Sequence, residues 1–353
     1  MQLRVSCVAA GSLCDAVAQR MPVHRLVKWD QCDTPSEERI ELARQTVKES
    51  DALLISPHCF THVVDLLHTD EGKQKFVQSP FAGVDAFLKH TRTFDAHERN
   101  FVFARFAHDF GVHMREFVLC AVLDRERQWH RLHHAQKQHQ WLGPALSADA
   151  YSYRLLRDVK VAVIGLGSIG NSVAECFKLL GSDVSGVARS SGKSRQLEKV
   201  YVTQEMPGDT EKQQLQTAVA SLLREQKPDY LVSVLPHTPS TEALLEGGVV
   251  MEALKESRPV LVNVGRGSLI STSHLLHLLD SDYLSHAIVD VWDQEPLPSD
   301  NAAWQHPKVT LTPHVSAMST PSDVAHVFAA NLEKFAAGDA ANIRGLVDLS
   351  GDY

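Results

Sequence analysis

The sequence of 353 residues lacks any apolar run that approaches membrane-spanning length. It also lacks an excess of basic charge, because 35 Lys and Arg residues stand against 43 Asp and Glu residues and give a net charge of −8. The first absence argues against a membrane protein, and the second against general nucleic-acid binding. We therefore expect neither as a partner, and an anionic substrate would need a local positive site.

The six cysteines include no C-x-x-C pair. Cys7 and Cys176 lie in apolar periodic stretches, which predicts reduced thiols in the core. Reduced thiols favour a reducing compartment, so we expect a cytoplasmic protein. Hydrophobic residues make up 44% of the chain, an ordinary value for a folded protein, and the length suffices for two domains.

A metal-binding pattern is also incomplete. The sequence predicts a long helix over about Met114–Trp141, and some of the histidines in its polar second half share a helix face, as a metal site would require. No cysteine or carboxylate cluster completes such a site, so we expect no metal and interpret this half as an exposed or inter-subunit helix. The histidines are His130, His133, His134 and His139.

The stretch Val161–Arg189 is the most informative part of the sequence. Its first four residues, Val161–Ile164, predict a strand buried on both faces. Gly165–Gly170 follows at once and reads GLGSIG, with G-x-G-x-x-G spacing. A helical repeat and a second short strand come next, and this strand–turn–helix–strand context favours a dinucleotide-binding turn over a chance glycine pattern. The repeat comprises Ile169, Val173, Phe177 and Leu180, and the second strand contains Val184 and Val187.

Each glycine of the motif has a predicted task. Gly165 allows the tight turn, Gly167 lets the backbone approach a pyrophosphate, and Gly170 lets helix and strand pack closely. The pyrophosphate would lie at the positive end of the helix dipole, so Ser168 and Ile169 are also candidate cofactor-binding residues.

The end of the second strand predicts which dinucleotide binds. An acidic residue is expected there to bind the adenosine ribose hydroxyls, but Arg189 stands at this position. Hydroxyl and basic side chains follow it, and they suit a 2′-phosphate that an Asp or Glu would repel. We therefore predict that NADPH is preferred and NADH possible, with a solvated basic loop as the alternative. The candidate contacts beside Arg189 are Ser190 and Lys193, with Ser191, Ser194 and Arg195 nearby.

Strands and helices alternate on both sides of this stretch. Before it, strands over Leu3–Ala9, Val23–Trp29, Ala52–Ser56 and Phe101–Phe106 predict a small α/β domain. After it, the same rhythm predicts a parallel sheet, and the last helix, Thr320–Ala337, is expected to pack back on the first domain.

Ligands of open α/β sheets bind at the carboxyl ends of the strands. Besides the glycine turn, the residues that follow predicted strands are Pro236, Arg266, Asp290 and His314. We expect these positions, which come from separate strands, to converge at one edge of the sheet.

Arg266, Glu295 and His314 together suit the reduction of a carbonyl group. A carboxylate such as Glu295 would keep the imidazole of His314 protonated and oriented. A protonated His314 would give a proton to a carbonyl oxygen while NADPH gives hydride to the carbon. The planar fork of Arg266 suits a substrate carboxylate. The set favours reversible reduction of a 2-oxo acid, although His314 taken alone is better explained as a structural histidine.

With these residues in place, the sequence resembles the D-isomer-specific 2-hydroxyacid dehydrogenase family, and most of all its glyoxylate/hydroxypyruvate reductase branch. The resemblance runs over nearly the whole chain and includes FAGVD at Phe81–Asp85 and the terminal VDLSGDY. Five further motifs carry it in order: GLGSIG at Gly165–Gly170, LPHTPST at Leu235–Thr241, NVGRG at Asn263–Gly267, DVWDQEPLP at Asp290–Pro298 and TPHVS at Thr312–Ser316.

The resemblance implies two Rossmann-like α/β domains with parallel sheets flanked by helices. Residues 1–104 with 318–353 would form a flavodoxin-like substrate-binding domain, and the inserted residues 105–317 the dinucleotide-binding domain. The family also implies a homodimer built around the long helix.

The resemblance further implies residue roles. Arg266 would bind substrate, Glu295 would support the histidine, and His314 would be the acid/base. The remaining roles are orientation of the nicotinamide carboxamide by Asp290, lining of the cofactor by Pro236 and Thr238 with Thr241 nearby, and binding of the substrate carboxylate by backbone N–H groups around Ala82, Gly83 and Val84.

The chain departs from the family pattern in two places. Ser271 and Thr272 stand where the family usually has an acidic pair, which should affect helix capping and not chemistry. The segment Pro57–His68 matches no secure pattern and is expected to help line the substrate site, and His58 is expected to be an exposed loop histidine.

The leading hypothesis is an NADPH-dependent reductase of glyoxylate, hydroxypyruvate or a similar small 2-oxo acid. Phosphoglycerate dehydrogenase is an alternative, but its extra regulatory domain would find little chain after Ala337. D-lactate and formate dehydrogenases would favour an acidic residue in place of Arg189. A dinucleotide-sensing interaction protein without turnover is the alternative from another class.

Overall fold

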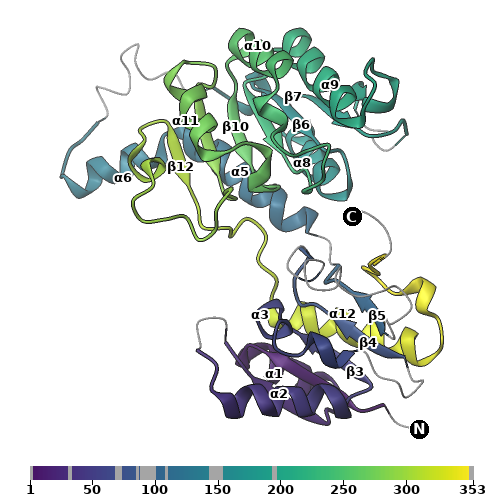
Figure 1. Ribbon diagram of the computed structural model, residues 1–353. Coiled ribbons are helices and arrows are strands. Elements are labelled where there is room, and N and C mark those ends of the chain that lie inside the picture. The colour runs from purple at the N-terminus through teal and green to yellow at the C-terminus, as the bar shows by residue number, and fades with distance from the viewer. Residues whose placement is uncertain are drawn as a thin grey trace. The chain divides into compact units, whose positions relative to one another are not determined.

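The computed structural model describes residues 3–30, 34–67, 74–84, 87, 101–107, 110–142, 154–192 and 197–349. The chain divides into two compact units, each with its own parallel sheet (Figure 1). Unit 1 comprises Met1–His108 and Ser319–Tyr353, and unit 2 comprises Asp109–Met318. The prediction of an α/β protein with two helix-flanked, Rossmann-like parallel sheets is confirmed. None of the helices described is both long and apolar enough to cross a membrane.

Within its described residues, unit 1 has a five-stranded parallel sheet in the order β2-β1-β3-β4-β5. This order is the flavodoxin-like one. The strands are β1 Val5–Ala9, β2 Arg25–Lys28, β3 Ala52–Ile55, β4 Lys75–Gln78 and β5 Phe101–Ala104. The helices are α1 Gly11–Arg20, α2 Glu37–Glu49, the short α3 Pro57–Phe60 and α12 Pro321–Ala336.

The last helix completes unit 1, as expected from the sequence. Helix α12 packs against α1, and its Phe328 ring stacks on Phe76 of β4 with the ring centroids 6.0 Å apart. The fully buried Asn331 donates to Gln78 Oε1 at 2.9 Å and accepts from the backbone N–H of Arg344 at 2.9 Å. These contacts connect helix α12 to strand β4, which lies more than 200 residues earlier in the sequence.

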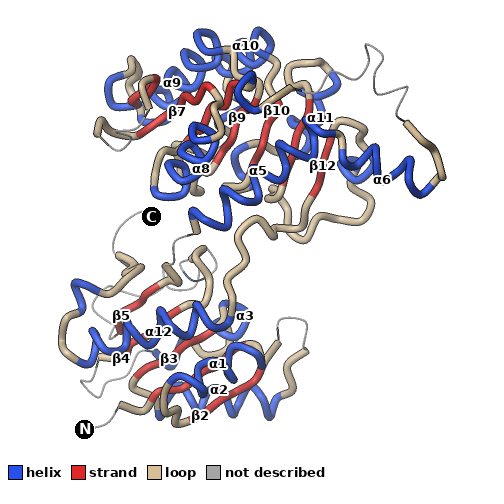
Figure 2. Tube along the Cα trace, turned by 180° about the vertical axis from the view of Figure 1, so that it is seen from behind, coloured by secondary structure: helices blue, strands red, loops and turns tan. Residues whose placement is uncertain are grey.

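The described part of unit 2 forms a seven-stranded parallel sheet in the order β12-β11-β10-β9-β6-β7-β8, whose strands lie side by side in Figure 2. The order reverses between β6 and β9, where such sheets bind ligands. The strands are β6 Lys160–Ile164, β7 Asp183–Ala188, β8 Lys199–Val202, β9 Tyr230–Ser233, β10 Val260–Asn263, β11 His286–Val289 and β12 Val309–Leu311. The helices are α5 Gly111–Arg127, α6 Trp129–Lys137, α8 Ser168–Leu179, α9 Glu211–Gln226, α10 Gly248–Ser257 and α11 Thr272–Asp280.

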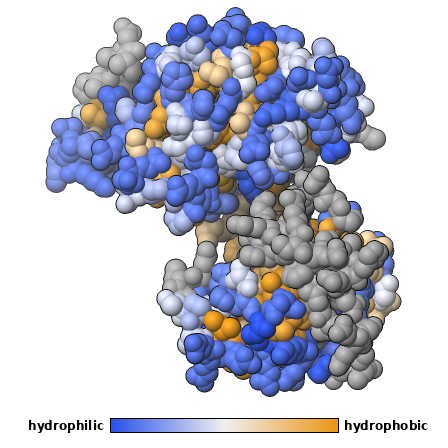
Figure 3. All heavy atoms as spheres, in the orientation of Figure 1, coloured by the Kyte–Doolittle hydropathy of each residue, from blue (hydrophilic) through white to orange (hydrophobic). Residues whose placement is uncertain are grey.

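Strand β6 shows why this sheet has helices on both faces. Its side chains alternate between two apolar clusters: Ala162 and Ile164 pack with residues of α9, α10 and α11, and Val161 and Val163 pack with residues of α5 and α8. All four side chains are fully buried, as expected for a strand covered on both sides. The visible surface of the described residues in Figure 3 is, by contrast, largely hydrophilic.

The predicted long helix is wrong in one respect, because it is two helices. Helix α5 ends at Arg127, and α6 begins at Trp129 after Gln128 adopts a left-handed conformation with φ of +53°. The buried face of α5 ends at Val122 and Glu126. The chain beyond it carries few apolar residues that would hold the helix straight against the sheet, and glutamine gives no sign of a break because it is a good helix former.

Three smaller differences also appear. Strand β8 was not predicted, because Lys199–Val202 is short and lies at the edge of the sheet with mostly half-buried side chains. Cys7 is fully buried as expected, but Cys176 is only half-buried, since Val173 and Phe177 occupy the inner face of α8. His58 is not an exposed loop residue: it lies in α3, is half-buried, and its Nε2 is 3.1 Å from the Trp29 carbonyl oxygen.

Candidate active site

The sheet of unit 2 brings the ends of five strands to one edge. Ile164 is in register with Ser233, Ser233 with Asn263, Asn263 with Val289, and Val289 with Leu311. The glycine turn, Pro236, Arg266, Asp290 and His314 follow these positions within a few residues. The predicted convergence of these residues at one sheet edge therefore agrees with the strand register.

The glycine turn has the geometry of a dinucleotide cradle. Gly165 has a φ of +101°, which L side chains rarely adopt, and a Cβ on Gly170 would overlap the Gly165 carbonyl oxygen. A Cβ on Gly167 would meet no atom within 4 Å, so the space beside it is open. No side chain caps the N-terminus of α8, where Ser168 is exposed and Ile169 half-buried. Open space at a positive helix end suits a pyrophosphate.

Arg189 follows β7 immediately and is exposed. Its backbone carbonyl accepts hydrogen bonds from Thr203 Oγ1 at 3.2 Å and Gln204 N at 3.4 Å. Its guanidinium Nη2 is 3.9 Å from Glu211 Oε1, a contact that sequence reasoning missed. Ser190 is half-buried, whereas the predicted contact Lys193 lies outside the described residues.

The loop after β9 is held by its own hydroxyl groups. Thr241 is buried, and its Oγ1 donates to the Pro236 carbonyl at 2.6 Å and accepts from Thr238 N at 2.9 Å. Pro236 is exposed at the start of this turn. The Thr241 hydroxyl therefore shapes the loop, and a direct contact between Thr241 and cofactor stays a prediction.

Arg266 is positioned by a buried asparagine. Asn263, at the end of β10, donates from Nδ2 to the Arg266 carbonyl at 3.1 Å, and its Oδ1 accepts from Gly265 N at 3.3 Å. The Arg266 guanidinium donates from Nη1 to the Gly265 carbonyl at 2.8 Å. The loop after β9 and the loop after β10 are joined by a contact between His237 Nδ1 and Ser268 Oγ, which are 2.7 Å apart. Neither Asn263 nor this pair was singled out from the sequence, although Asn263 belongs to the NVGRG motif.

Asp290 is fully buried, and both of its carboxylate oxygens are engaged by the segment that carries His314. Oδ1 accepts from Thr312 Oγ1 at 2.6 Å and from Val315 N at 2.9 Å, and Oδ2 accepts from Ser316 N at 2.8 Å. The Asp290 carbonyl also accepts from His314 N at 2.8 Å. The carboxylate thus holds this segment in place, and its predicted role towards the nicotinamide stays a prediction.

His314 and Glu295 meet as the sequence predicts. His314 Nδ1 is 2.7 Å from Glu295 Oε2, and Glu295 Oε1 accepts from the backbone N–H of Trp292 at 2.8 Å. Because Nδ1 is bound to the carboxylate, Nε2 is the ring nitrogen that remains available to a ligand. The pair is accessible, with 51% of the His314 side chain and 35% of the Glu295 side chain exposed.

The two groups shift each other's proton affinity. The hydrogen bond to Glu295 raises the pKa of His314, against an opposing contribution from burial and from the positive charge of Arg266. Burial alone would raise the pKa of Glu295, but the hydrogen bonds from His314 and Trp292 lower it overall. The pair therefore favours an imidazolium beside a carboxylate, and Arg266 is near enough for its positive charge to oppose protonation of His314.

The predicted helix-capping role of Ser271 is confirmed, because its side chain accepts from His274 N at the start of α11. Thr272 does something that was not foreseen: its backbone N–H and its hydroxyl both donate to Asp293, at 2.9 and 2.5 Å. Asp293 lies two residues before Glu295, so Thr272 helps to hold the loop that supports the histidine.

In unit 1, the segment Ala82–Val84 follows β4. Ser79 Oγ accepts from Phe81 N at 3.1 Å, and the Phe81 carbonyl accepts from Phe106 N at 3.1 Å. Ala82 and Gly83 are half-buried and Val84 is buried.

In the part of the chain that the structure describes, no three His, Cys, Asp or Glu side chains converge closely enough to hold a metal ion.

The buried Asp290 carboxylate generates a stability prediction. Burial alone would raise its pKa, but hydrogen bonds from Ser316, Thr312 and Val315 lower it. The ionised form therefore stabilises the fold above the unfolded-state pKa, about 4, and this stabilisation is lost as the pH falls through the lower folded-state pKa. Asp290→Asn would turn an N–H₂ group towards the Ser316 N–H and lower the free energy of unfolding by about 2 kcal/mol at pH 7.

Urea unfolding measured from pH 7 downwards checks this expectation. The difference in free energy of unfolding between Asp290→Asn and wild type should shrink at acid pH. Asp300→Asn, an exposed carboxylate nearby in the chain, is the matched control and should leave stability unchanged. Equal stabilities of the two variants at pH 7 would contradict the prediction.

Comparison with known proteins agrees with this geometry. Residues 119–316 match the family described as D-isomer specific 2-hydroxyacid dehydrogenase, NAD binding domain. Glyoxylate/hydroxypyruvate reductase A from Serratia proteamaculans is 28% identical over 284 residues, which cover 79% of this chain and 82% of that protein. The protein of the same name from Citrobacter koseri is 26% identical over 281 residues, covering 78% and 81%.

Two solved structures resemble the whole chain. A D-isomer specific 2-hydroxyacid dehydrogenase family protein from Aeromonas salmonicida has a TM-score of 0.77 and 27% identity, covering 99% of this chain and 100% of the other. The NADPH-dependent glyoxylate/hydroxypyruvate reductase from Sinorhizobium meliloti, in complex with NADP and sulfate, has a TM-score of 0.74 and 25% identity, covering both chains fully. Because the matched family domain spans more than half of the chain and contains the glycine cradle, Arg266 and the Glu295–His314 pair, the protein belongs to the D-isomer specific 2-hydroxyacid dehydrogenases and is an NAD(P)-dependent oxidoreductase.

Proposed function

We propose that the protein reduces a small 2-oxo acid of the glyoxylate or hydroxypyruvate type to the 2-hydroxy acid, with NADPH as the preferred reductant. The observation that carries the proposal is the His314–Glu295 pair, in which Nδ1 and Oε2 are 2.7 Å apart. The guanidinium of Arg266 is near enough for its charge to lower the pKa of His314. The names of the relatives from Serratia and Citrobacter support the substrate class. The NADP complex of the Sinorhizobium reductase supports the cofactor.

The residues present fit a dinucleotide. A side chain at Gly170 would block the turn, the space beside Gly167 is open, and the N-terminus of α8 has no side-chain cap. In the proposed complex, the Gly165–Gly170 turn holds the pyrophosphate, Arg189 and Ser190 bind the 2′-phosphate, and Pro236 lines the cofactor. When bound, the dinucleotide supplies the hydride that reduces the carbonyl carbon.

The protein's own residues supply the proton and the orientation of the substrate. Arg266 binds the substrate carboxylate and draws electron density towards the carbonyl oxygen. The imidazolium of His314 donates its Nε2 proton to that oxygen as the carbon receives hydride, and Glu295 stabilises the charge until the proton leaves. In the reverse direction, neutral His314 takes the hydroxyl proton. We propose the backbone N–H groups around Ala82–Val84 in unit 1 as further carboxylate ligands.

Turnover measurements test the proposed reaction. The purified protein should oxidise NADPH faster than NADH in the presence of glyoxylate or hydroxypyruvate, with pyruvate and longer 2-oxo acids tested in parallel. His314→Ala should lower kcat by about 100-fold or more, because the general acid is gone, while NADPH binding persists. His277→Ala, an exposed histidine on α11, is the control. Unchanged turnover in His314→Ala would remove its role, and tight NADPH binding without turnover of any acid would favour a dinucleotide-sensing protein.

The pH dependence of reduction tests the role of the His314–Glu295 pair. Glu295 raises the pKa of His314, and reduction needs the protonated form, so kcat/KM for reduction should fall as the pH rises through a value above the ordinary histidine pKa of about 6.5. Glu295→Gln removes the carboxylate charge and should move this descending limb to lower pH. Glu295→Asp keeps the charge and should retain more of the wild-type profile. An identical midpoint in wild type and Glu295→Gln would show that the pair does not control the proton.

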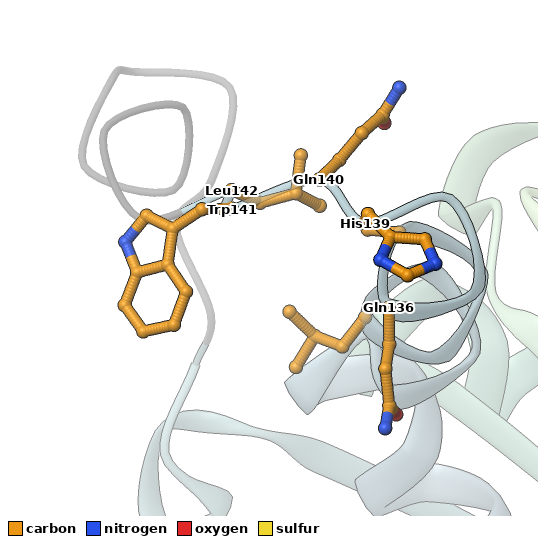
Figure 4. A pocket seen from close by; sticks show the side chains of 7 residues that line it. Gln136, His139, Gln140, Trp141 and Leu142 are labelled. Carbon is orange, nitrogen blue, oxygen red and sulfur yellow. The ribbon is translucent and has the colours of Figure 1, made fainter.

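We also propose that the protein is a homodimer whose interface includes α6. Leu132, Ala135 and Trp141 line a mainly apolar pocket at this helix, and the Trp141 ring, 91% exposed, extends away from the helix (Figure 4). An exposed tryptophan beside an apolar hollow is typical of an interface.

The dimer is tested by sedimentation. Wild type should sediment as a dimer, and Leu132→Glu should raise the dimer dissociation constant by about tenfold or more, because it places an unpaired charge in an apolar contact. Leu179→Glu, at an apolar residue that is 81% exposed on α8, is the control and should remain dimeric. A monomeric wild type, or a Leu132→Glu variant that dimerises as tightly as wild type, would contradict the proposal.

A further inference from the structure

Glu211 lies next to Arg189, the residue that stands where an acidic side chain would bind the adenosine ribose. It is the first residue of α9, a helix that packs against β7, β8 and the short 3-10 helix η4, Thr203–Glu205. Its Oε1 is 3.9 Å from Nη2 of Arg189, and both side chains are 74% exposed. A carboxylate thus stands next to the guanidinium that the proposed function assigns to the 2′-phosphate.

The backbones that carry the two side chains are both fixed. Thr210 caps α9 by accepting from Gln213 N at 3.2 Å, and Gln213 Oε1 accepts in turn from Thr210 N at 3.2 Å. The hydrogen bonds from η4 to the Arg189 carbonyl fix the other side. Because Thr210 and Gln213 already cap the helix, the Glu211 carboxylate is not needed for capping and faces Arg189 instead.

We propose that Glu211 sets how strongly the protein discriminates between NADPH and NADH; the inference rests on the proposed function, in which Arg189 binds the 2′-phosphate. A 2′-phosphate must compete with Glu211 for the guanidinium and is repelled by its charge, which weakens NADPH binding. The 2′-hydroxyl of NADH carries no charge and can donate a hydrogen bond to the carboxylate, so Arg189 keeps its partner. Glu211 therefore reduces the preference for NADPH that Arg189 creates, so that the protein can bind both NADPH and NADH.

The exposure of both groups limits the size of the effect. Water and salt screen charges at such positions, and exposed pairs change binding or stability only modestly. The discriminating quantity is therefore the ratio of the NADH dissociation constant to the NADPH dissociation constant, since any general effect of a substitution on the protein cancels in this ratio.

The test is a titration of the full-length protein with NADPH and with NADH, followed by fluorescence at low ionic strength. Glu211→Gln should raise the ratio by about threefold to tenfold, because it removes a repulsive charge from the NADPH complex and replaces a charged acceptor with a weaker neutral one in the NADH complex. Raising the salt concentration should shrink the change in NADPH binding. Arg189→Gln should change the ratio in the opposite direction.

Two further variants control the test. Glu211→Asp keeps the charge and should stay close to the wild-type ratio, and Glu175→Gln, which removes an exposed carboxylate from α8, should leave it unchanged. A ratio that is unchanged or lower in Glu211→Gln, while wild type binds NADPH and Arg189→Gln weakens it, would overturn this inference alone. Failure of wild type to bind either dinucleotide would instead overturn the proposed function.

Discussion

The carboxylate of Asp290 is the contact on which the proposed active site depends. It is fully buried at the end of β11, and among the described residues the donors to its carboxylate oxygens come from Thr312–Ser316, the segment after the neighbouring strand. An isolated charge in such a place would be costly, so the segment must fold around it. His314 lies inside that segment with a φ of +55°, a left-handed conformation that is uncommon for residues other than glycine. The carboxylate therefore determines where the imidazole stands before any ligand is considered.

The three proposed reactive side chains, Arg266, His314 and Glu295, are supported in the same way. Asn263 holds the backbone at Arg266, Asp290 holds the backbone at His314, and Thr272 holds Asp293 in the loop before Glu295. In each case a polar side chain bonds to a loop at the carboxyl edge of the sheet while the reactive side chain remains accessible. The sheet supplies the alignment of the strand ends, and these polar contacts supply the exact path of each loop.

Features that depend on local patterns could be predicted from the sequence. The strand–turn–helix unit around Gly165–Gly170 follows from glycine spacing that the turn requires, and the Ser271 cap follows from the preference of serine for helix N-termini. Ordered motifs led to Glu295 beside His314. Features that depend on how distant elements pack could not. The approach of Glu211 to Arg189 requires α9 to lie against β7, and the break at Gln128 occurs at a residue that normally continues a helix. The use of both Asp290 oxygens by one segment is likewise invisible without the register of β11 and β12.

The contacts of α12 have a consequence for how the protein is made. Unit 1 contains both the first strands of the chain and a helix that follows all of unit 2. During synthesis, residues 321–336, which pack against α1 and reach the buried Gln78, emerge only after the residues of unit 2. The nascent chain therefore carries an unfinished first unit through most of its translation. The order of the residues in the sequence thus differs from the order in which the two units can be completed, because the last helix of unit 1 is translated after all of unit 2.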